Sequence, residues 1–114
     1  MLKPDVIRKK KDFSLLYGKG KSKGGKYVVL FYRRNNLPYN RKAFLASKKV
    51  GKSVERNRAR RLMRESYRTL EKKLPIGYDI LIIARNTISS EGIKCEDVEK
   101  SMKHLMNKSG LFSG

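Results

Sequence analysis

Residues 53–74 read SVERNRARRLMRESYRTLEKKL and predict the longest helix of the chain. At 100° per residue, the apolar side chains gather on one side and most of the arginines on the other. Glu55 lies in the first turn, next to the positive end of the helix dipole, and Pro75 follows the end of the pattern. This stretch therefore predicts an amphipathic helix with a core-facing side and a cationic side.

The cationic side continues a dense cluster of positive charge. Residues 48–68 carry nine positive side chains, and Arg56, Arg60, Arg64 and Arg68 follow one another at a spacing where like charges repel. Arginine dominates over lysine, and its planar guanidinium group suits bidentate contacts with phosphate. The predicted RNA-binding residues of this segment are Lys48, Lys49, Lys52, Arg56, Asn57, Arg58, Arg60, Arg61, Arg64 and Arg68.

The positive charge is confined to the first two-thirds of the chain. The 114 residues hold 29 Lys plus Arg and 10 Asp plus Glu, which gives a net charge of +19. Residues 1–73 contain 24 basic and 5 acidic side chains, whereas residues 74–114 contain 5 of each. Such self-repulsion excludes an ordinary metabolic enzyme, because only a polyanion would relieve it. The partner is expected to be a nucleic acid or, less often, an anionic membrane.

Length and composition predict one domain over residues 1–114 with a modest core. No apolar run reaches the roughly 20 residues that span a bilayer. The N-terminus shows no export signal, and a lone Cys95 cannot form an internal disulfide. A cytoplasmic location is therefore expected.

Two shorter helices flank the long one. Apolar residues at 13, 16 and 17 predict a helix over residues 12–17, and a second apolar face predicts one over about 95–108. Between the first helix and residue 27, the chain is rich in glycine and lysine and is expected to be a flexible basic loop.

Three segments predict strands. Residues 27–32 and 41–50 are expected to form an antiparallel hairpin across an Asn- and Pro-containing turn. Residues 78–85 are apolar on both faces in their centre, as in a buried central strand. Since this strand follows the long helix, residues 41–85 predict a β-α-β unit.

Residues 46–53 read ASKKVGKS and end like a phosphate-binding P-loop. An NTPase would use Lys52 on the phosphates and Ser53 on magnesium. However, Ala46 replaces the first glycine, the pattern continues as strand up to Val50, and Asp79 precedes its apolar run instead of following it. An NTPase is therefore the least favoured of three hypotheses and ranks behind the two nucleic-acid-binding functions described below.

Aromatic residues are interleaved with the basic ones. At least half of them are expected in the core, and any exposed on a sheet would stack on unpaired bases. The sequence does not sort these six residues, which are Phe13, Tyr17, Tyr27, Phe31, Tyr32 and Phe44. Neither His104 nor Cys95 has partners at metal-ligand or catalytic spacing, so neither a zinc-type metal site nor a catalytic group is expected in the protein. Whether the protein binds another metal ion is left open by the sequence.

Residues 47–65 resemble the signature of the bacterial ribonuclease P protein component, and the similarity extends over about residues 7–111. Its core, Arg-Asn-Arg-x-Arg/Lys-Arg-x-x-Arg, is filled by Arg56, Asn57, Arg58, Arg60, Arg61 and Arg64. The resemblance implies an α+β fold, a two-layer α-β sandwich with a mixed, mainly antiparallel four-stranded sheet. It also implies a β-α-β crossover of the rare left hand.

The resemblance further implies a role in tRNA 5′ maturation. In that family the RNA subunit with Mg²⁺ performs the hydrolysis, and the protein binds this RNA and the single-stranded 5′ leader of precursor tRNA. The leader cleft would be lined by Phe13, Tyr17, Ser22 and Phe31, and one protein would join one RNA as a monomer. Tyr17 stands where the family more often has Phe. The second hypothesis, a small ribosomal protein or RNA chaperone, shares the size and charge.

Overall fold

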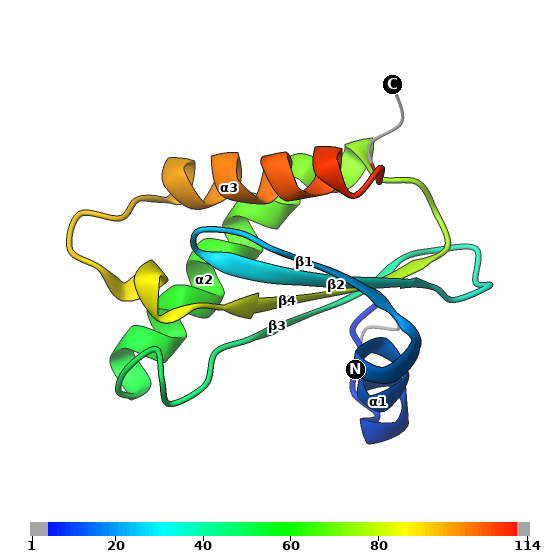
Figure 1. The fold of residues 1–114 in the computed structure, drawn as a ribbon, viewed down its shortest axis with the longest axis horizontal. Coiled ribbons are helices and arrows are strands. Elements are labelled where there is room, and N and C mark those ends of the chain that lie inside the picture. The colour runs from blue at the N-terminus through cyan, green and yellow to red at the C-terminus, as the bar shows by residue number, and fades with distance from the viewer. Residues whose placement is uncertain (1–4, 112–114) are drawn as a thin grey trace.

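The structure, a computed structural model, describes residues 5–111 and contains one four-stranded sheet and three α-helices (Figure 1). The three predicted helices are confirmed, although the longest one ends at Leu70 and continues as a short 3-10 turn. In chain order the elements are α1 (Lys10–Lys19), β1 (Lys21–Gly24), β2 (Val28–Arg34), β3 (Arg41–Leu45), α2 (Ser53–Leu70), η1 (Glu71–Lys73), β4 (Tyr78–Ala84), η2 (Asn86–Ser89) and α3 (Cys95–Lys108).

The strands lie in the order β1-β2-β4-β3. β3 and β4 run parallel, and the other neighbouring pairs are antiparallel. The predicted α+β fold with a mixed, mainly antiparallel sheet is thus confirmed, and β4 is central because its side chains are apolar on both faces. β3, α2 and β4 form the predicted β-α-β unit, and the hand of its crossover stays a prediction.

The predicted hairpin between residues 27–32 and 41–50 is wrong. β4 lies between β2 and β3, and β3 ends at Leu45. The turn after β2 is bound to the start of β4 instead, since Asn40 Nδ2 donates to the Pro75 carbonyl at 2.8 Å and Asn40 Oδ1 accepts from the Tyr78 amide at 2.8 Å. These bonds hold the turn against the start of β4, which takes the place beside β2 that was predicted for residues 41–50.

Half of the loop expected between α1 and β2 is in fact a strand, β1. β1 pairs with β2 along its length, with Ser22 opposite Phe31, although all four of its residues are exposed. An edge strand without a buried side chain carries no hydrophobic alternation, which is why the sequence pattern missed it. The tight turn from α1 into β1 requires glycine at position 20, because a Cβ there would lie 2.5 Å from the Leu16 carbonyl oxygen.

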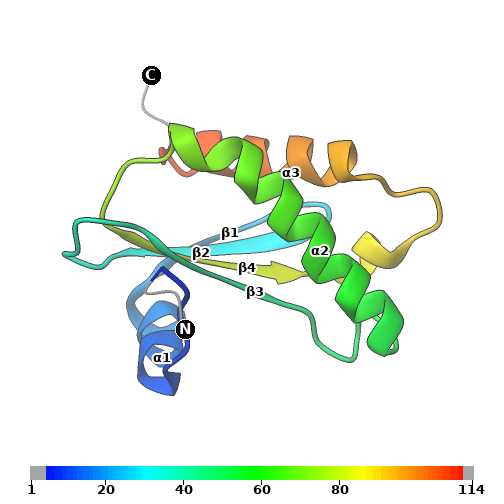
Figure 2. The same cartoon turned by 180° about the vertical axis from the view of Figure 1, so that it is seen from behind.

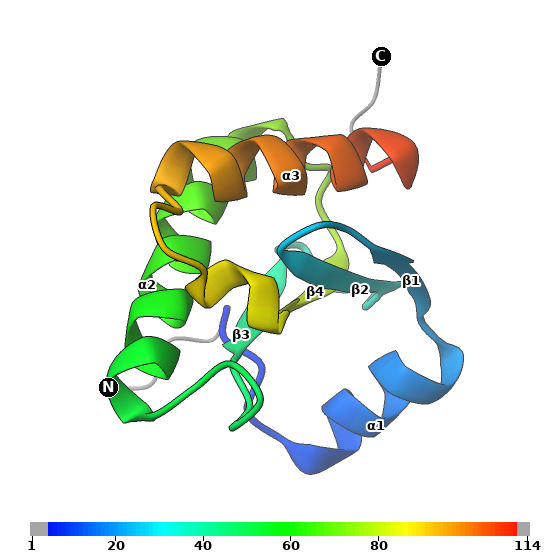
Figure 3. The ribbon, with the colours of Figure 1, turned by 60° about the vertical axis from the view of Figure 1, so that its left-hand side comes forward.

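The sheet separates two apolar clusters. The larger lies under α2 and α3 and includes Leu30, Ile80 and Ile82, as the layers in Figures 1 and 2 show. The smaller lies on the opposite face, where α1 covers one end of the sheet (Figure 3). Its buried members are Ile7, Leu16, Ala43 and Leu81. One face of the sheet is therefore fully covered, and the other only in part.

Candidate nucleic-acid interface

The cationic side of α2 is exposed, and its opposite side is buried in the larger cluster. The angular prediction is confirmed, because the buried residues of α2 are Ala59, Leu62, Met63, Ser66, Tyr67 and Leu70. Arg61, Arg64 and Arg68 are exposed. Within residues 5–111 these three guanidinium groups make no hydrogen bond or ion pair, so they are available to an external anion.

Four further side chains of the predicted set have partners inside the protein. Arg56 donates to the Ser53 hydroxyl oxygen at 3.3 Å, within the first turn of α2. Arg58 donates to the Ile93 carbonyl at 2.6 Å and so ties α2 to the segment before α3. Arg60 donates to the side-chain oxygen of Asn57, which orients both groups on the helix surface. Arg58 therefore contacts a segment outside α2, whereas the bonds of Arg56 and Arg60 stay within the helix.

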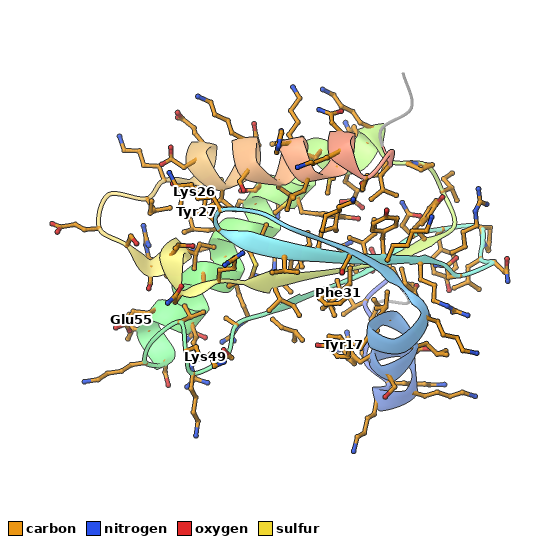
Figure 4. All side chains as sticks on the ribbon, in the orientation of Figure 1. Tyr17, Lys26, Tyr27, Phe31, Lys49 and Glu55 are labelled. Atoms are coloured by element: carbon orange, nitrogen blue, oxygen red, sulfur yellow. The ribbon has the colours of Figure 1, made fainter. Side chains whose placement is uncertain are left out.

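The predicted lysines surround the start of α2. Lys48, Lys49 and Lys52 are exposed, and Lys49 lies at the end of the molecule away from Tyr17 (Figure 4). The preceding turn is closed by bonds from the Val50 amide to Ser47 and from the Gly51 amide to Lys48, at 3.0 and 3.2 Å. Amides used in this way cannot cradle phosphates as a P-loop does, so the geometry disfavours the NTPase hypothesis.

The four residues predicted for a leader cleft, Phe13, Tyr17, Ser22 and Phe31, converge on the half-covered face of the sheet. Ser22, Phe31 and Leu81 occupy one row across neighbouring strands. Tyr17 of α1 meets Phe31 edge-on, with ring centroids 5.2 Å apart, and the two side chains lie together between α1 and the sheet in Figure 4. Tyr17 is 49% exposed, whereas Phe13 and Phe31 are half-buried against the smaller cluster.

The other three aromatic candidates belong to the core. Tyr27 and Tyr32 are buried, and the Tyr32 hydroxyl donates to the Ser109 carbonyl at 3.3 Å. Phe44 packs edge-on against Tyr67, with centroids 5.5 Å apart. Burial raises the pKa of the Tyr67 phenol above its usual value, so this hydroxyl stays neutral. Stacking candidates are therefore limited to Phe13, Tyr17 and Phe31.

A buried ion-pair network that the sequence analysis missed holds α1 to the sheet. The Asp79 carboxylate, 4% exposed, accepts two bonds from Arg41 at 2.6 and 2.8 Å and one from Asn35 at 2.9 Å. Arg41 also reaches Asp12 of α1 at 3.3 Å. The hydrogen bond with Asp79 raises the pKa of Arg41, which stays charged. The only available signal was Asp79 itself, a carboxylate at the start of a buried strand.

Two hollows connect the aromatic and basic regions. One, of about 330 Å³, lies at the edge of β3 and is bordered by Phe13, Leu45 and Arg64. The other, of about 500 Å³, lies on α2 and is bordered by Asn57, Arg61 and again Arg64. Arg64 thus stands where the half-covered face of the sheet meets the arginine-rich side of α2.

The family model for ribonuclease P matches residues 1–110. The chain belongs to the ribonuclease P protein family. It is 42% identical over 113 residues to the ribonuclease P protein component of Clostridium botulinum (strain Loch Maree / Type A3), covering 98% of this chain and all of that protein. It is 41% identical over 108 residues to that of Thermoanaerobacter sp. (strain X514), covering 95% of this chain and 91% of the relative.

Solved structures of ribonuclease P proteins share the fold. The Staphylococcus aureus protein superimposes with a TM-score of 0.84 at 27% identity, covering 97% of this chain and 100% of that one. The Thermotoga maritima protein gives 0.81 at 30% identity, covering 90% and 96%. RNA binding and tRNA 5′ processing follow from ribonuclease P family membership, as the signature in residues 56–64 predicted. The comparisons do not favour a small ribosomal protein or RNA chaperone.

As a ribonuclease P protein component, the chain is part of an endoribonuclease complex and a partner of ribonuclease P RNA. Among the helices of residues 5–111, none combines the length and apolar character needed to cross a membrane.

Proposed function

We propose that the protein binds ribonuclease P RNA through the arginine-rich side of α2 and holds the 5′ leader of precursor tRNA on the half-covered face of the sheet. The protein works as one monomer per RNA in the cytoplasm and takes no direct part in the hydrolysis. The observation that carries this proposal is the position of Arg64, which borders both the helix hollow and the groove beside Phe13.

The arginine-rich side suits an RNA backbone. Three exposed guanidinium groups, those of Arg61, Arg64 and Arg68, have no partner in the described part of the chain, and each can neutralise a phosphate and release its counterions. The lysines at the start of α2 extend this surface toward the end of the molecule. A basic protein lying between two RNAs also lowers their mutual repulsion, and so favours retention of Mg²⁺ near the cleavage site.

The half-covered face suits a single-stranded leader of variable sequence. Aromatic rings stack on any base, because every base has a π-face. Phe31 and Tyr17 present such rings beside each other, and Tyr17 is the more exposed of the two. Ser22 adds an exposed hydroxyl in the same row as Phe31. Binding of this kind needs stacking and backbone contacts and does not depend on base readout.

The proposal places the Mg²⁺ that supports hydrolysis on the RNA. Among residues 5–111, no three His, Cys, Asp or Glu side chains lie close enough together to hold a metal ion. The most buried carboxylate, Asp79, is already engaged by Arg41 and Asn35. The chain's own residues bind and orient RNA, and the metal bound to RNA supplies the activation of water.

Reconstitution tests the proposal. The full chain is mixed with a ribonuclease P RNA and precursor tRNA at low Mg²⁺, and cleavage rate and substrate affinity are measured with and without the protein. We expect the protein to raise both, and to raise affinity more for leader-bearing substrate than for mature tRNA. The proposal is wrong if the protein changes neither quantity.

Lys103→Ala provides a matched control for single-charge losses on α2. This lysine is exposed on α3, a helix that carries none of the predicted RNA-binding residues, and its loss changes the net charge equally. Arg61→Ala is expected to weaken binding of ribonuclease P RNA, and Lys103→Ala to leave it nearly unchanged. Equal losses in the two variants would indicate a general charge effect of the kind an RNA chaperone would show.

A further inference from the structure

On the outer edge of β3, away from β4, the backbone of Lys42 is hydrogen-bonded to the N-terminal segment. The next residue whose backbone faces outward has no such partner among residues 5–111. The Lys42 amide donates to the Asp5 carbonyl at 2.8 Å, and the Ile7 amide donates to the Lys42 carbonyl at 2.9 Å. Beyond this pairing the N-terminal segment leads into α1, which lies away from the edge of β3 (Figure 3). The N-terminal segment therefore covers the edge of β3 only around Lys42.

Phe44 repeats the edge geometry of Lys42 two residues further along. Alternate residues of a strand direct their N–H and C=O groups to the same side, so those of Phe44 point away from β4. Within residues 5–111, no other segment pairs with β3 at this position. One backbone donor and one backbone acceptor are thus presented side by side at an open edge.

This open edge faces the groove of about 330 Å³, whose lining includes Phe44. Ile7, Phe13 and Leu45 supply apolar walls, and Arg64 stands at the rim. The volume lies at the lower end of the roughly 300–1,000 Å³ found for small-molecule sites. The groove therefore offers space for one flat ring system, a pair of hydrogen-bonding groups and a cation beside them.

A nucleobase matches these three features. Each of the four RNA bases carries a donor next to an acceptor on its Watson–Crick edge, and a donor–acceptor pair of the backbone can bond to any of them. The ring would lie between the apolar walls, and Arg64 would meet the adjoining phosphate. A base already paired in a duplex has no free Watson–Crick edge, so such a groove accepts only unpaired nucleotides.

We propose that the groove at the edge of β3 binds one unpaired base of the precursor tRNA leader, through hydrogen bonds from its Watson–Crick edge to the backbone of Phe44. This inference rests on the proposed function, since it assumes that the leader reaches the sheet beside Phe13. It explains how the surface can prefer single strands without preferring a sequence. It also gives Arg64 a contact with the leader in addition to its place on α2.

The first experiment modifies the RNA and leaves the protein intact. Precursor tRNAs carry 3-methyluridine at one leader position at a time, and the matched controls carry 5-methyluridine at the same position. Both modifications add one neutral methyl group, but only the first blocks the Watson–Crick edge. At one leader position we expect 3-methyluridine to weaken binding by the holoenzyme about tenfold relative to 5-methyluridine, as the loss of two hydrogen bonds predicts. With the RNA subunit alone, the two should bind equally.

The second experiment removes the backbone donor. Phe44→Pro lacks the N–H group, and an outward-facing edge position is one where a sheet tolerates proline. Phe44→Leu is the matched control, because it also loses the ring contact with Tyr67 but keeps the amide. We expect Phe44→Pro to abolish the difference between the two methyluridines and Phe44→Leu to retain it. Circular dichroism and urea unfolding verify that both variants fold, and the experiment on modified RNA remains decisive if Phe44→Pro does not.

The outcomes separate this inference from the proposed function. If the holoenzyme prefers leader-bearing substrate but binds both methyluridines equally at every leader position, the groove assignment is wrong and the proposed function stands. If no leader preference is found, both are wrong. Amide exchange adds a direct reading, since bound leader should slow exchange at Phe44. Protection that instead rises with protein concentration, without RNA, would assign the edge to a second copy of the chain and overturn the proposal.

Discussion

The two faces of the sheet have similar side chains but different surroundings. Along β2, Val28, Leu30 and Tyr32 point to the face under α2 and α3 and are buried, whereas Val29 and Phe31 alternate with them and are only half-buried. Two helices cover the first face, and α1 covers only one end of the second. A partly exposed apolar surface beside a cationic helix indicates a binding surface, because contact between apolar side chains and water is unfavourable and a ligand would remove it.

The strongest test of this comparison removes one apolar side chain from each face. Ile82→Ala, at a fully buried position, should lower the free energy of unfolding by about 4 kcal/mol. Phe31→Ala should cost less, about 1–2 kcal/mol, because the ring is already partly exposed. Urea unfolding of both variants in one buffer checks the order. A larger loss for Phe31→Ala would mean that the second face is also a closed core.

Phe31→Ala, the variant with the smaller expected loss of stability, should have a specific effect on RNA binding. Phe31→Ala should weaken binding of leader-bearing precursor tRNA by about tenfold or more, as expected for the loss of one stacking contact. Binding of mature tRNA should change little. Equal losses for the two substrates would place Phe31 in the structural core.

The next test addresses how α1 is held on the half-covered face. Asp79→Ala removes the buried partner of Arg41 and should lower the free energy of unfolding by about 3 kcal/mol, since the partly buried Arg41 then keeps only its longer contact with Asp12. Asp12→Asn weakens only the more exposed contact at 3.3 Å and should cost about 0.5 kcal/mol. Thermal unfolding of both variants measures the difference. Similar effects would show that Arg41 does not depend on Asp79.

Much of the covered face could be predicted from the sequence, and much less of the other. α2, α3 and β4 carry strong apolar patterns, because each buries a continuous side against the larger cluster. β1 carries none, since its stability comes from backbone bonds to β2. The pairing order also escaped prediction, because the side-chain bonds of Asn40 to the start of β4 connect residues far apart in the chain.

The candidate site could likewise be predicted from the sequence only in part. The angular positions on the long helix were sufficient to place Arg61, Arg64 and Arg68 on the exposed side. Alternation along β2 implies that Phe31 and Tyr32 point to opposite faces, but only the position of α1 shows which face stays open. The contact of Arg58 with Ile93 depends on how the segment before α3 folds back, and no local pattern records it.

A smaller effect is expected for the arginines that border the half-covered face. Arg64→Ala should leave the free energy of unfolding within about 0.5 kcal/mol of the unmodified protein, because the side chain is exposed. Binding of ribonuclease P RNA should weaken, and the slope of log affinity against log salt should fall by about one phosphate contact. A salt titration with Arg61→Ala as a second variant measures this. An unchanged slope in both would place the arginines outside the interface.

The smallest effect is expected for the hydroxyl of Tyr17. Tyr17→Phe keeps the ring that meets Phe31 edge-on and removes a group that lies on a 49%-exposed side chain. Stability should stay within about 0.5 kcal/mol, and affinity for leader-bearing substrate should change less than threefold. Tyr17→Ala, in contrast, should weaken leader binding clearly, because the stacking ring is lost. If Tyr17→Phe matched Tyr17→Ala in leader affinity, the hydroxyl and not the ring would make the contact, and the half-covered face would recognise its ligand by hydrogen bonding at this position.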